Sequence, residues 1–524
     1  MTETKRLAIA EILACKKLGI TSKLGIAKRL VSSRPDIFKN TSSARRVVQR
    51  ILGSCGEPIP ADCQDVYETY IAEYKPEDAY VTAKNRPTVK AKRYIITSAV
   101  NGTPVFKELW NNILSYASHL NAEIYVIAMR YKNPTSIFSD STEDTWCSDV
   151  IPYLDANRHV IHKTVEVMGD VKIQPTAKNP LNGKESLSGG MSCIFGHPRV
   201  HMKFLPVLKG EKPKMMISTG SVTLPNYTDS SIGVEGSFHH TYGFTMVNVI
   251  DEERADIHYV TARSDGGFID HGVELKDGII GEASGVKGLI LGDIHSAKLS
   301  EVAMDRMIST MTRFKPEVVV IHDVFDAESI NPHEANDPIL KHKKMMQGRH
   351  LLGAEIDRAI CIMGGIKFFT KQLVVVNSNH DRFLDRYIAG GDWKKDLPNA
   401  ITYAGLTLKA LCGEANKGLF SKIVEERLPD VKCLAIDESY KIEGIELGNH
   451  GDIGSNGSKG SPLQFKKLSS KGVTGHTHSP LRLDGHSVVG CQDLDHEYNV
   501  GMSSWALGDI IINSDGKRQH IFYF

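Results

Sequence analysis

The sequence predicts an α/β protein, because short apolar strands alternate with amphipathic helices along much of its 524 residues. Runs such as Val318–Ile321 and Leu373–Val376 are rich in β-branched residues, and each is followed at once by polar side chains. Segments with helical spacing of apolar residues separate them, as in 301–314. Since α/β sheets bind ligands beyond the carboxyl ends of their strands, the polar strand ends predict the place of a functional site.

Composition and charge indicate a globular protein of the cytoplasm. Apolar residues make up 41% and charged residues 24% of the chain, and no apolar run approaches the roughly 20 residues of a membrane span. The N-terminal segment carries Glu3 and Glu11 and lacks the apolar core of a signal peptide. The nine cysteines include no C-x-x-C pair, which favours reduced thiols over disulfides or a cysteine-type zinc site. We therefore expect no association with a membrane.

Residues 1–56 predict a small basic domain of three helices. They hold twelve Lys and Arg against three acids, and the stretch "IAKRL" resembles the second helix of helix-turn-helix DNA-binding proteins. Clustered cations bind polyanions strongly, so we expect this domain to contact DNA. The expected contacts are Lys28, Arg29, Arg45, Arg46 and Arg50. A solvated basic surface or an oligomerisation module is the alternative interpretation.

Residues 57–93 predict a linker, which begins acidic and ends in the basic stretch "TAKNRPTVKAKR". Residues 94–285 then predict an α/β middle domain whose role the sequence leaves open. It starts with strand, helix and strand in "YIITSAV", "PVFKELWNNILSYASHLNA" and "EIYVIAMRY", which is the pattern of a βαβ unit.

Residues 286–524 predict a second α/β domain. The strands are "KGLILGDIH", "PEVVVIHDVFD" and "QLVVVNSNHD", each with a polar end. An amphipathic helix is expected over 301–314 and a long helical region over about 339–366.

Five short segments carry polar side chains at strand ends or in glycine-containing turns of this domain. They are Asp293-Ile294-His295, His322-Asp323-Val324-Phe325-Asp326, Asn379-His380-Asp381, Gly448-Asn449-His450 and Gly475-His476-Thr477-His478. Hard or borderline divalent ions such as Mn²⁺ bind carboxylate, imidazole and amide groups. Two such ions about 3.5–4 Å apart can bind a phosphate ester and assist its displacement, so the pattern predicts a two-metal hydrolase. On extended backbone, alternate side chains share a face, which lets Asp293 and His295 reach one site, and likewise His476 and His478.

In this order, the five segments resemble the signature of the calcineurin-like metallophosphoesterases, over residues from about 286 to 490. The resemblance implies a sandwich of β-sheets flanked by helices, and two divalent ions, Mn²⁺ in the first place and Mg²⁺ as the alternative. It implies a first metal held by Asp293, His295 and His478, a second held by Asn379, His450 and His476, and Asp323 as the bridge between them. It also implies that His380 protonates the leaving oxygen or stabilises charge, and that Asp326 or Asp381 orients it.

Two positions depart from the family pattern. His322 and Ser378 stand where the family has glycines that permit tight turns. No ligand position is replaced.

The substrate is open on the fold alone. "HDVFDAESINP" resembles the corresponding block of SbcD-type DNA-repair nucleases, and the basic N-terminal domain also favours DNA. The whole layout resembles the early nucleases with which tailed phages degrade host DNA, which implies an oligomeric, Mn²⁺-dependent DNase in the bacterial cytoplasm. The alternatives are a phosphatase or nucleotide phosphodiesterase, and a DNA-binding scaffold whose phosphoesterase domain is structural.

Overall fold

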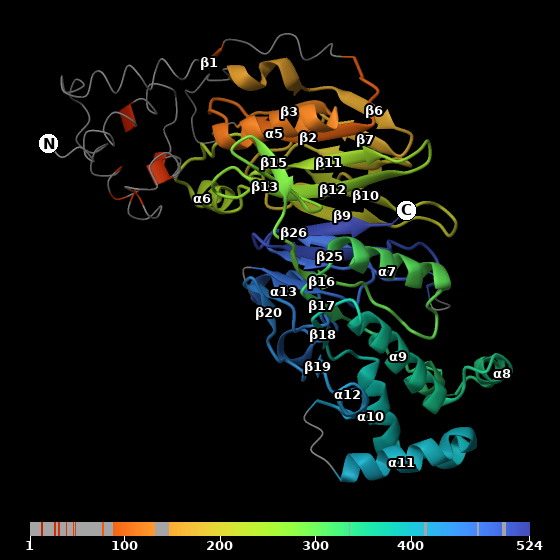
Figure 1. The fold of residues 1–524 in the computed structure, drawn as a ribbon. Helices are drawn as coiled ribbons and strands as arrows, with labels where there is room; N and C mark the ends of the chain where they lie inside the picture. The colour runs from red at the N-terminus through yellow and green to blue at the C-terminus, as the bar shows by residue number, and fades with distance from the viewer. Residues whose placement is uncertain are drawn as a thin grey trace. The chain divides into compact units, whose positions relative to one another are not determined.

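The computed structural model describes residues 87–131, 146–334, 336–412, 417–468, 471–494 and 499–523, strand β1 (Pro76–Glu77) and scattered positions between 12 and 48 (Figure 1). The chain is mixed α/β and separates into two compact units. The first contains residues 1–202 and 215–282, and the second contains 203–214 and 283–524. The predicted division into three domains and a linker stays a prediction. Among the described helices, none is both long and apolar enough to cross a bilayer.

The first unit contains the predicted βαβ unit. Strands β2 (Arg93–Val100) and β3 (Glu123–Met129) are parallel, and helix α5 (Lys107–Leu120) connects them, so this prediction is confirmed. A five-stranded sheet has the order β12-β11-β2-β3-β5. The other elements are β4 (Trp146–Cys147), β5 (Leu154–Asp155), β6 (Arg158–His162), β7 (Val165–Met168), β8 (Ser192–Phe195), β10 (Lys214–Ser218), α6 (Ser231–Phe238), β11 (Gly243–Val249), β12 (Ala255–Thr261), β13 (Phe268–Asp270), β14 (Val273–Lys276) and β15 (Ile279–Glu282). Strand β9 (His201–Leu205) includes the last residues of the segment 1–202 and the first of the segment 203–214.

A buried ion network lies on β12 and β13 of this unit. The two ring nitrogens of His258 lie 2.7 Å from Asp256 Oδ2 and 2.8 Å from Asp270 Oδ1, and Tyr116 donates its hydroxyl to Asp270 Oδ2 at 2.9 Å. Burial opposes a charge on His258, but the carboxylates of Asp270 and Asp256 outweigh it and raise the pKa of His258 to about 10. His258 is therefore an imidazolium between the buried Asp270 and the partly buried Asp256.

We expect His258→Gln to lower the free energy of unfolding by roughly 3–5 kcal/mol, because it leaves the buried Asp270 and the partly buried Asp256 without their cation. The folded pKa lies above the ordinary 6.5, so the stabilisation is complete below pH 6.5 and is lost as pH rises towards 10. Urea unfolding between pH 6 and 10 measures both effects. His119→Gln, at the exposed end of α5, is the matched control. Equal unfolding curves for the two variants would contradict the charged assignment.

The second unit is built on a six-stranded sheet of order β19-β18-β17-β16-β25-β26. The four strands β16 to β19 are parallel, whereas β25 and β26 are antiparallel to their neighbours. Their bounds are β16 (Val286–Ile290), β17 (Val318–Ile321), β18 (Gln372–Val375), β19 (Val431–Cys433), β25 (Gly508–Asn513) and β26 (Arg518–Phe522).

Both faces of this sheet are buried, because alternate strand residues point to opposite sides. Val319 and Ile321 of β17 join a core with helices α7 (Glu301–Phe314) and α9 (Leu352–Lys367), whereas Val320 joins a core with residues of a second sheet. The second sheet contains β20 (Lys441–Ile442), β21 (Ile445–Glu446), β22 (Gly472–Thr474), β23 (Leu481–Leu483) and β24 (His486–Val488). The unit is thus layered as helices, sheet and sheet.

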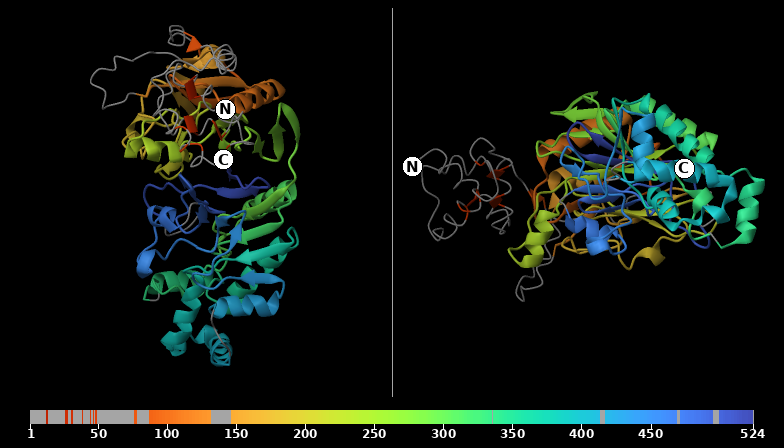
Figure 2. Two further views of the ribbon diagram at one scale, coloured as in Figure 1. Left: turned by 90° about the vertical axis from the view of Figure 1, so that its left-hand side faces the viewer. Right: turned by 90° about the horizontal axis from the view of Figure 1, so that it is seen from below.

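The helices of this unit partly match the prediction. Helix α7 coincides with the predicted 301–314. The single helical region expected over about 339–366 is wrong, because the chain forms α8 (Pro338–Met346) and α9 with a break at Gly348, whose φ is 70°. The further helices are α10 (Asp381–Gly390), α11 (Ala400–Leu411), α12 (Leu419–Arg427) and α13 (Pro462–Leu468). In Figure 1 and in the left view of Figure 2, the teal to cyan helices α9 to α11 gather at one end of the unit.

Candidate metal centre

The polar segments predicted from the sequence all follow strands of the second unit. Asp293 comes three residues after β16, Asp323 two after β17 and Asn379 four after β18. His450 follows β21, and His476 follows β22 of the second sheet. Backbone bonds connect the ends of neighbouring strands, as His295 N–H donates to Asp323 O at 2.8 Å and Gly475 N–H donates to His450 O at 2.7 Å. The strand ends therefore meet at one edge.

The first cluster contains Asp293, His295, Asp323 and His478, whose ligand atoms lie within 4.8 Å of one another and are all buried. The Nε2 atoms of His295 and His478 are 3.0 Å apart. Nε2 of His478 is also 3.1 Å from Asp293 Oδ2, and Nε2 of His295 is 3.8 Å from Asp323 Oδ2. Two imidazole nitrogens and two carboxylates thus converge on one point.

The second cluster contains Asp323, His450 and His476, again within 4.8 Å. Nε2 of His450 lies 3.2 Å from Asp323 Oδ2, and the rings of His450 and His476 are 5.1 Å apart. The amide oxygen of Asn379 is buried without a hydrogen-bond donor among the described residues. Asp323 belongs to both clusters, which makes it the one carboxylate that they share.

Four of these residues have left-handed backbone, which is uncommon outside glycine. The φ angles are 49° at His295, 46° at Asp323, 72° at His476 and 55° at His478. Such conformations cost of order 1–3 kcal/mol each and persist only where the surroundings enforce them. The extended geometry expected for D-x-H and H-x-H is therefore wrong, and His476 and His478 belong to different clusters.

The charges in the clusters compensate one another. Burial opposes a charge on His295, but the carboxylates of Asp326 and Asp323 outweigh burial and raise the pKa of His295 to about 9. Burial likewise opposes a charge on His450, and the carboxylate of Asp323 raises the pKa of His450 to about 9. Burial alone would raise the pKa of the Asp293 carboxyl, but His478 and His450 outweigh burial and hold this pKa below its usual range. Carboxylate–imidazolium pairs thus hold the clusters together. A divalent cation bound here has to displace those protons, so its affinity increases with pH.

His380 lies beside the first cluster, and Asp326 holds it there. The ring of His380 is 5.1 Å from that of His295, and its Nδ1–H donates to the backbone oxygen of Asp326 at 2.6 Å. The carboxylate of Asp326 accepts from His295 Nδ1 at 3.1 Å and is 3.7 Å from His380 Nδ1. Asp326 therefore fixes the tautomer of both rings and leaves Nε2 of His380 to act on a substrate.

Asp381 supports the turn rather than the histidine. Its Oδ2 accepts from Ser378 N–H at 3.0 Å, and its own N–H donates to Ser378 Oγ at 3.2 Å. This reciprocal pair is a capping arrangement at the start of α10, and it explains the serine where the family has glycine. The other departure, His322, is buried with its Nδ1 3.5 Å from His450 Nδ1, and burial with that neighbour lowers its pKa to about 4.

The donor set fits divalent cations. The buried oxygens Oδ1 of Asp293 and Oδ1 of Asp323 have no hydrogen-bond donor among the described residues, as is also true of Asn379 Oδ1. A buried polar atom without a partner is costly, and a bound cation removes that cost. Carboxylate, imidazole and amide donors are those that Mn²⁺ and Mg²⁺ accept, with Mn²⁺ the more tolerant of imidazole.

Gly475 lies so close to Asp293 that no side chain fits there, because a Cβ at this position would lie 2.3 Å from Asp293 Oδ1. We expect Gly475→Ala to displace this carboxylate and to weaken metal binding by roughly 10–100-fold, the range seen when a ligand loses its orientation. Isothermal titration with Mn²⁺ measures the change. Gly365→Ala in α9 is the matched control, since a Cβ there meets nothing within 4 Å. Equal affinities in the two variants would contradict the proposed crowding.

Trp505 is a neighbour of the first cluster that the sequence pattern did not predict. Its ring packs edge-on against His478, with the centroids 4.2 Å apart. Trp505 lies outside every polar segment, so only the three-dimensional structure associates it with the clusters.

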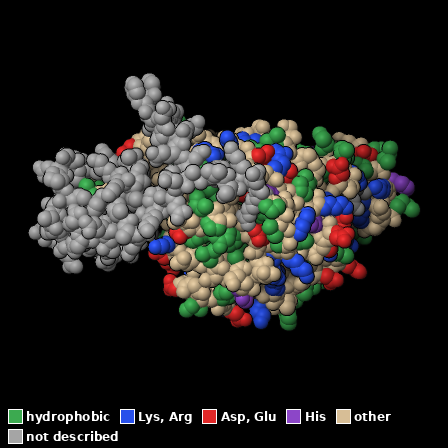
Figure 3. All heavy atoms as spheres, turned by 90° about the horizontal axis from the view of Figure 1, so that it is seen from above, with side chains coloured by type: hydrophobic (Ala, Val, Ile, Leu, Met, Phe, Trp, Pro, Cys, Tyr) green, Lys and Arg blue, Asp and Glu red, His purple; other side chains and the backbone are tan. Residues whose placement is uncertain are grey.

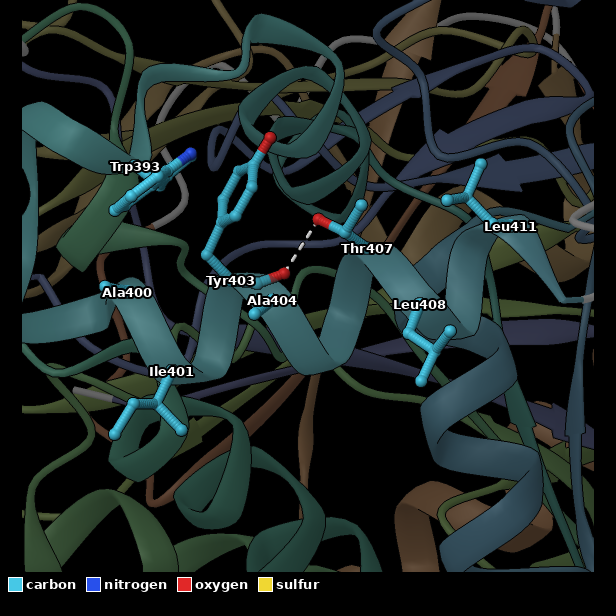
Figure 4. Close-up of a pocket in the computed structure, with 8 residues that line it drawn as sticks. All are labelled: Trp393, Ala400, Ile401, Tyr403, Ala404, Thr407, Leu408 and Leu411. Carbon is cyan, nitrogen blue, oxygen red and sulfur yellow. Dashed lines mark hydrogen bonds between the residues drawn. The ribbon is translucent and has the colours of Figure 1, made fainter.

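An apolar pocket of about 630 Å³ shares no residue with the clusters (Figure 4). It is lined by Trp393 and by side chains of one face of α11, which include Ile401, Tyr403 and Leu408. The dashed line drawn there is the hydrogen bond that Thr407 Oγ1–H donates to the backbone oxygen of Tyr403 at 2.8 Å. Its lining residues include no His, Cys, Asp or Glu that could bind a metal.

Of the residues expected to contact DNA, Arg46 is described, and it is helical and exposed. Lys28, Arg29, Arg45 and Arg50 lie outside the described residues. On the face shown in Figure 3, basic and acidic side chains are interspersed over the described part of the surface.

The chain is similar to Protein A1 of Escherichia phage T5, with 29% identity over 476 residues that cover 85% of this chain and 84% of that protein. No family model matches the chain. No solved structure matches it. The similarity to this phage protein thus extends over most of the chain.

Proposed function

We propose that this protein is a phage metallophosphoesterase of the calcineurin-like type, and that it hydrolyses DNA with two divalent metal ions. The observation that carries the proposal is the pair of buried clusters that share Asp323, with His380 beside them. Two adjacent sites with a shared carboxylate are the arrangement that two-metal phosphoesterases need. The layering of helices, sheet and sheet also supports this type.

The chain offers a complete set of ligands for two ions. Asp293, His295 and His478 would hold one ion, Asn379, His450 and His476 the other, and Asp323 both. When bound, such a pair of ions supplies Lewis-acid polarisation of the phosphate and activation of water near neutral pH.

His380 acts on the leaving group in this proposal. Because its Nδ1–H is bound to Asp326 O, the ring presents Nε2 to the substrate. A protonated Nε2 donates to the departing oxygen, and the carboxylate of Asp326, 3.7 Å from Nδ1, stabilises the positive ring. Asp326 is thus a positioning residue, and Asp381 acts on the backbone turn that carries His380.

DNA is the substrate that we propose, for two reasons. The first 56 residues carry a net charge of +9, which suits a polyanion. The similarity to a phage protein supports a role in infection, and degradation of host DNA would place the enzyme in the bacterial cytoplasm.

The test is incubation of supercoiled plasmid with the protein in Mn²⁺, in Mg²⁺ and in EDTA. Cleavage with Mn²⁺ that EDTA abolishes is the expected result. Hydrolysis of bis-p-nitrophenyl phosphate without plasmid cleavage would keep the phosphoesterase and contradict the DNase. DNA binding without either activity would favour a scaffold.

We expect His380→Ala to lower the rate of plasmid cleavage by roughly 10²–10⁴-fold, the usual contribution of a general acid. Its affinity for Mn²⁺ should stay close to that of the native protein, since His380 is not among the proposed ligands. Single-turnover cleavage and metal titration separate the two effects. His119→Ala, an exposed histidine of α5, is the control. A loss of metal affinity equal to the loss of rate would assign His380 to the metal instead.

A further inference from the structure

A cavity of about 360 Å³ lies next to the candidate centre, within the second unit. Its lining comes from the loop after Asp326, from α8 and from α10, and includes Glu328, Lys341, Phe383, Arg386, Tyr387 and Gly390. This volume falls within the range of small-molecule sites.

Phe383 connects the cavity to the chemistry. Its ring lies 5.1 Å from that of His380 and also lines the cavity. Glu328, which also lines the cavity, follows Asp326 by two residues on the chain. A group held in the cavity therefore neighbours the phosphate on which His380 would act.

The walls suit a flat ring with polar edges. Phe383 and Tyr387 supply aromatic surface, and the guanidinium of Arg386 lies 5.4 Å from the ring centroid of Phe383. Tyr387 donates its hydroxyl to Asp396 Oδ2 at 2.9 Å, so a hydrogen-bond acceptor is fixed at the wall. Aromatic rings and arginine planes are the surfaces on which nucleobases stack.

The rim suits a polyanion. Residues 338–350 contain three lysines and one arginine and no acid. Lys341 lines the cavity and is exposed. The acids of the wall are engaged, because Glu328 pairs with Arg349 and Glu334 pairs with Lys344. Lys341 thus offers a positive charge at the rim, where phosphates would pass.

We propose that this cavity holds the nucleobase of a nucleotide that adjoins the scissile phosphate, with Lys341 on the flanking backbone phosphate. The inference rests on the proposed function, since it names the part of the DNA substrate that each surface contacts. It predicts that the protein binds single-stranded DNA through bases as well as phosphates.

Gly390 provides a way to close the cavity. It lines the cavity near the end of α10, and a Cβ built there meets nothing within 4 Å. Gly390→Phe should therefore add an aromatic ring at the cavity wall without a clash at Cβ. Gly365→Phe in α9 is the matched control, because that glycine is equally open and does not line the cavity.

The experiment measures fluorescence anisotropy of a labelled single-stranded 12-mer, and of an abasic 12-mer of equal charge, in EDTA at low salt. We expect the native protein and Gly365→Phe to bind the base-containing strand at least about tenfold more tightly than the abasic strand. Gly390→Phe should bind both strands equally. Lys341→Glu should weaken both and lower the salt dependence by about one unit of slope.

A native protein without preference for bases, or a preference that survives in Gly390→Phe, would overturn the inference. Hydrolysis of bis-p-nitrophenyl phosphate in Mn²⁺ tests the proposed function separately, because this diester has no nucleobase. Its absence in the native protein would contradict the phosphoesterase while leaving the binding result in place.

Discussion

Asp323→Asn is expected to lower Mn²⁺-dependent cleavage of plasmid DNA by at least roughly 10³-fold. Asp323 is the one carboxylate common to both clusters, and it is buried with Oδ2 3.2 Å from His450 and 3.8 Å from His295. A neutral amide supplies one oxygen and no charge, so it cannot offset two adjacent cations. Charge stabilisation by metals contributes several kcal/mol to phosphoester cleavage, and about 1.4 kcal/mol corresponds to tenfold.

The matched control is Asp357→Asn, an exposed carboxylate of α9 that pairs with Arg427 at 2.6 Å. An exposed pair of this kind contributes little to stability, so this variant should cleave DNA as the native protein does. Cleavage and metal stoichiometry are measured on the same preparations. Full activity of Asp323→Asn would rule out a bridging carboxylate.

The second large effect is on stability. We expect Mn²⁺ at one hundred times its dissociation constant to stabilise the protein by about 2.7 kcal/mol per ion relative to EDTA. A gain of this size corresponds to roughly 5–10 °C in Tm for a unit of 150–250 residues. The physical reason is that the ion satisfies the buried oxygens of Asp293, Asp323 and Asn379, which lack hydrogen-bond donors among the described residues. Thermal unfolding followed by circular dichroism measures the shift.

The Tm of Asp293→Asn should rise less with Mn²⁺ than that of the native protein, because the substitution removes a ligand from the first cluster. The Tm of Asp357→Asn should rise with Mn²⁺ as much as that of the native protein. If all three proteins shifted equally, the ion would bind elsewhere.

Much of this site was predictable from the sequence, because its signal is local. A run of β-branched residues that ends in polar residues marks the carboxyl end of a strand, and parallel strands bring such ends together. Asp293, Asp323 and Asn379 each follow a parallel strand, so their convergence follows from the strand pattern. Helix α7 was predictable for the same reason, since its apolar spacing is regular.

Other features depend on contacts between distant segments. The left-handed backbone of His295 and His478 contradicts the extended geometry inferred from spacing, because the tertiary structure overrides the local preference of these residues. The role of Asp381 depends on whether its carboxylate accepts a hydrogen bond from His380 or from Ser378. The spacing of residues in the sequence does not decide this, and in the structure the partner is Ser378. The break between α8 and α9 depends on one glycine, Gly348, and glycines also occur inside helices.

The spread of the ligands along the chain has a consequence for synthesis. His295 and His478, whose nitrogens lie 3.0 Å apart, are separated by 183 positions in the sequence. At about 5–20 residues per second, a ribosome takes roughly 10–40 seconds to pass from one to the other. During that interval the nascent chain holds only part of either cluster. Neither cluster can therefore be complete before His476 and His478 have been added to the chain, and a product that ends before them would lack part of both clusters.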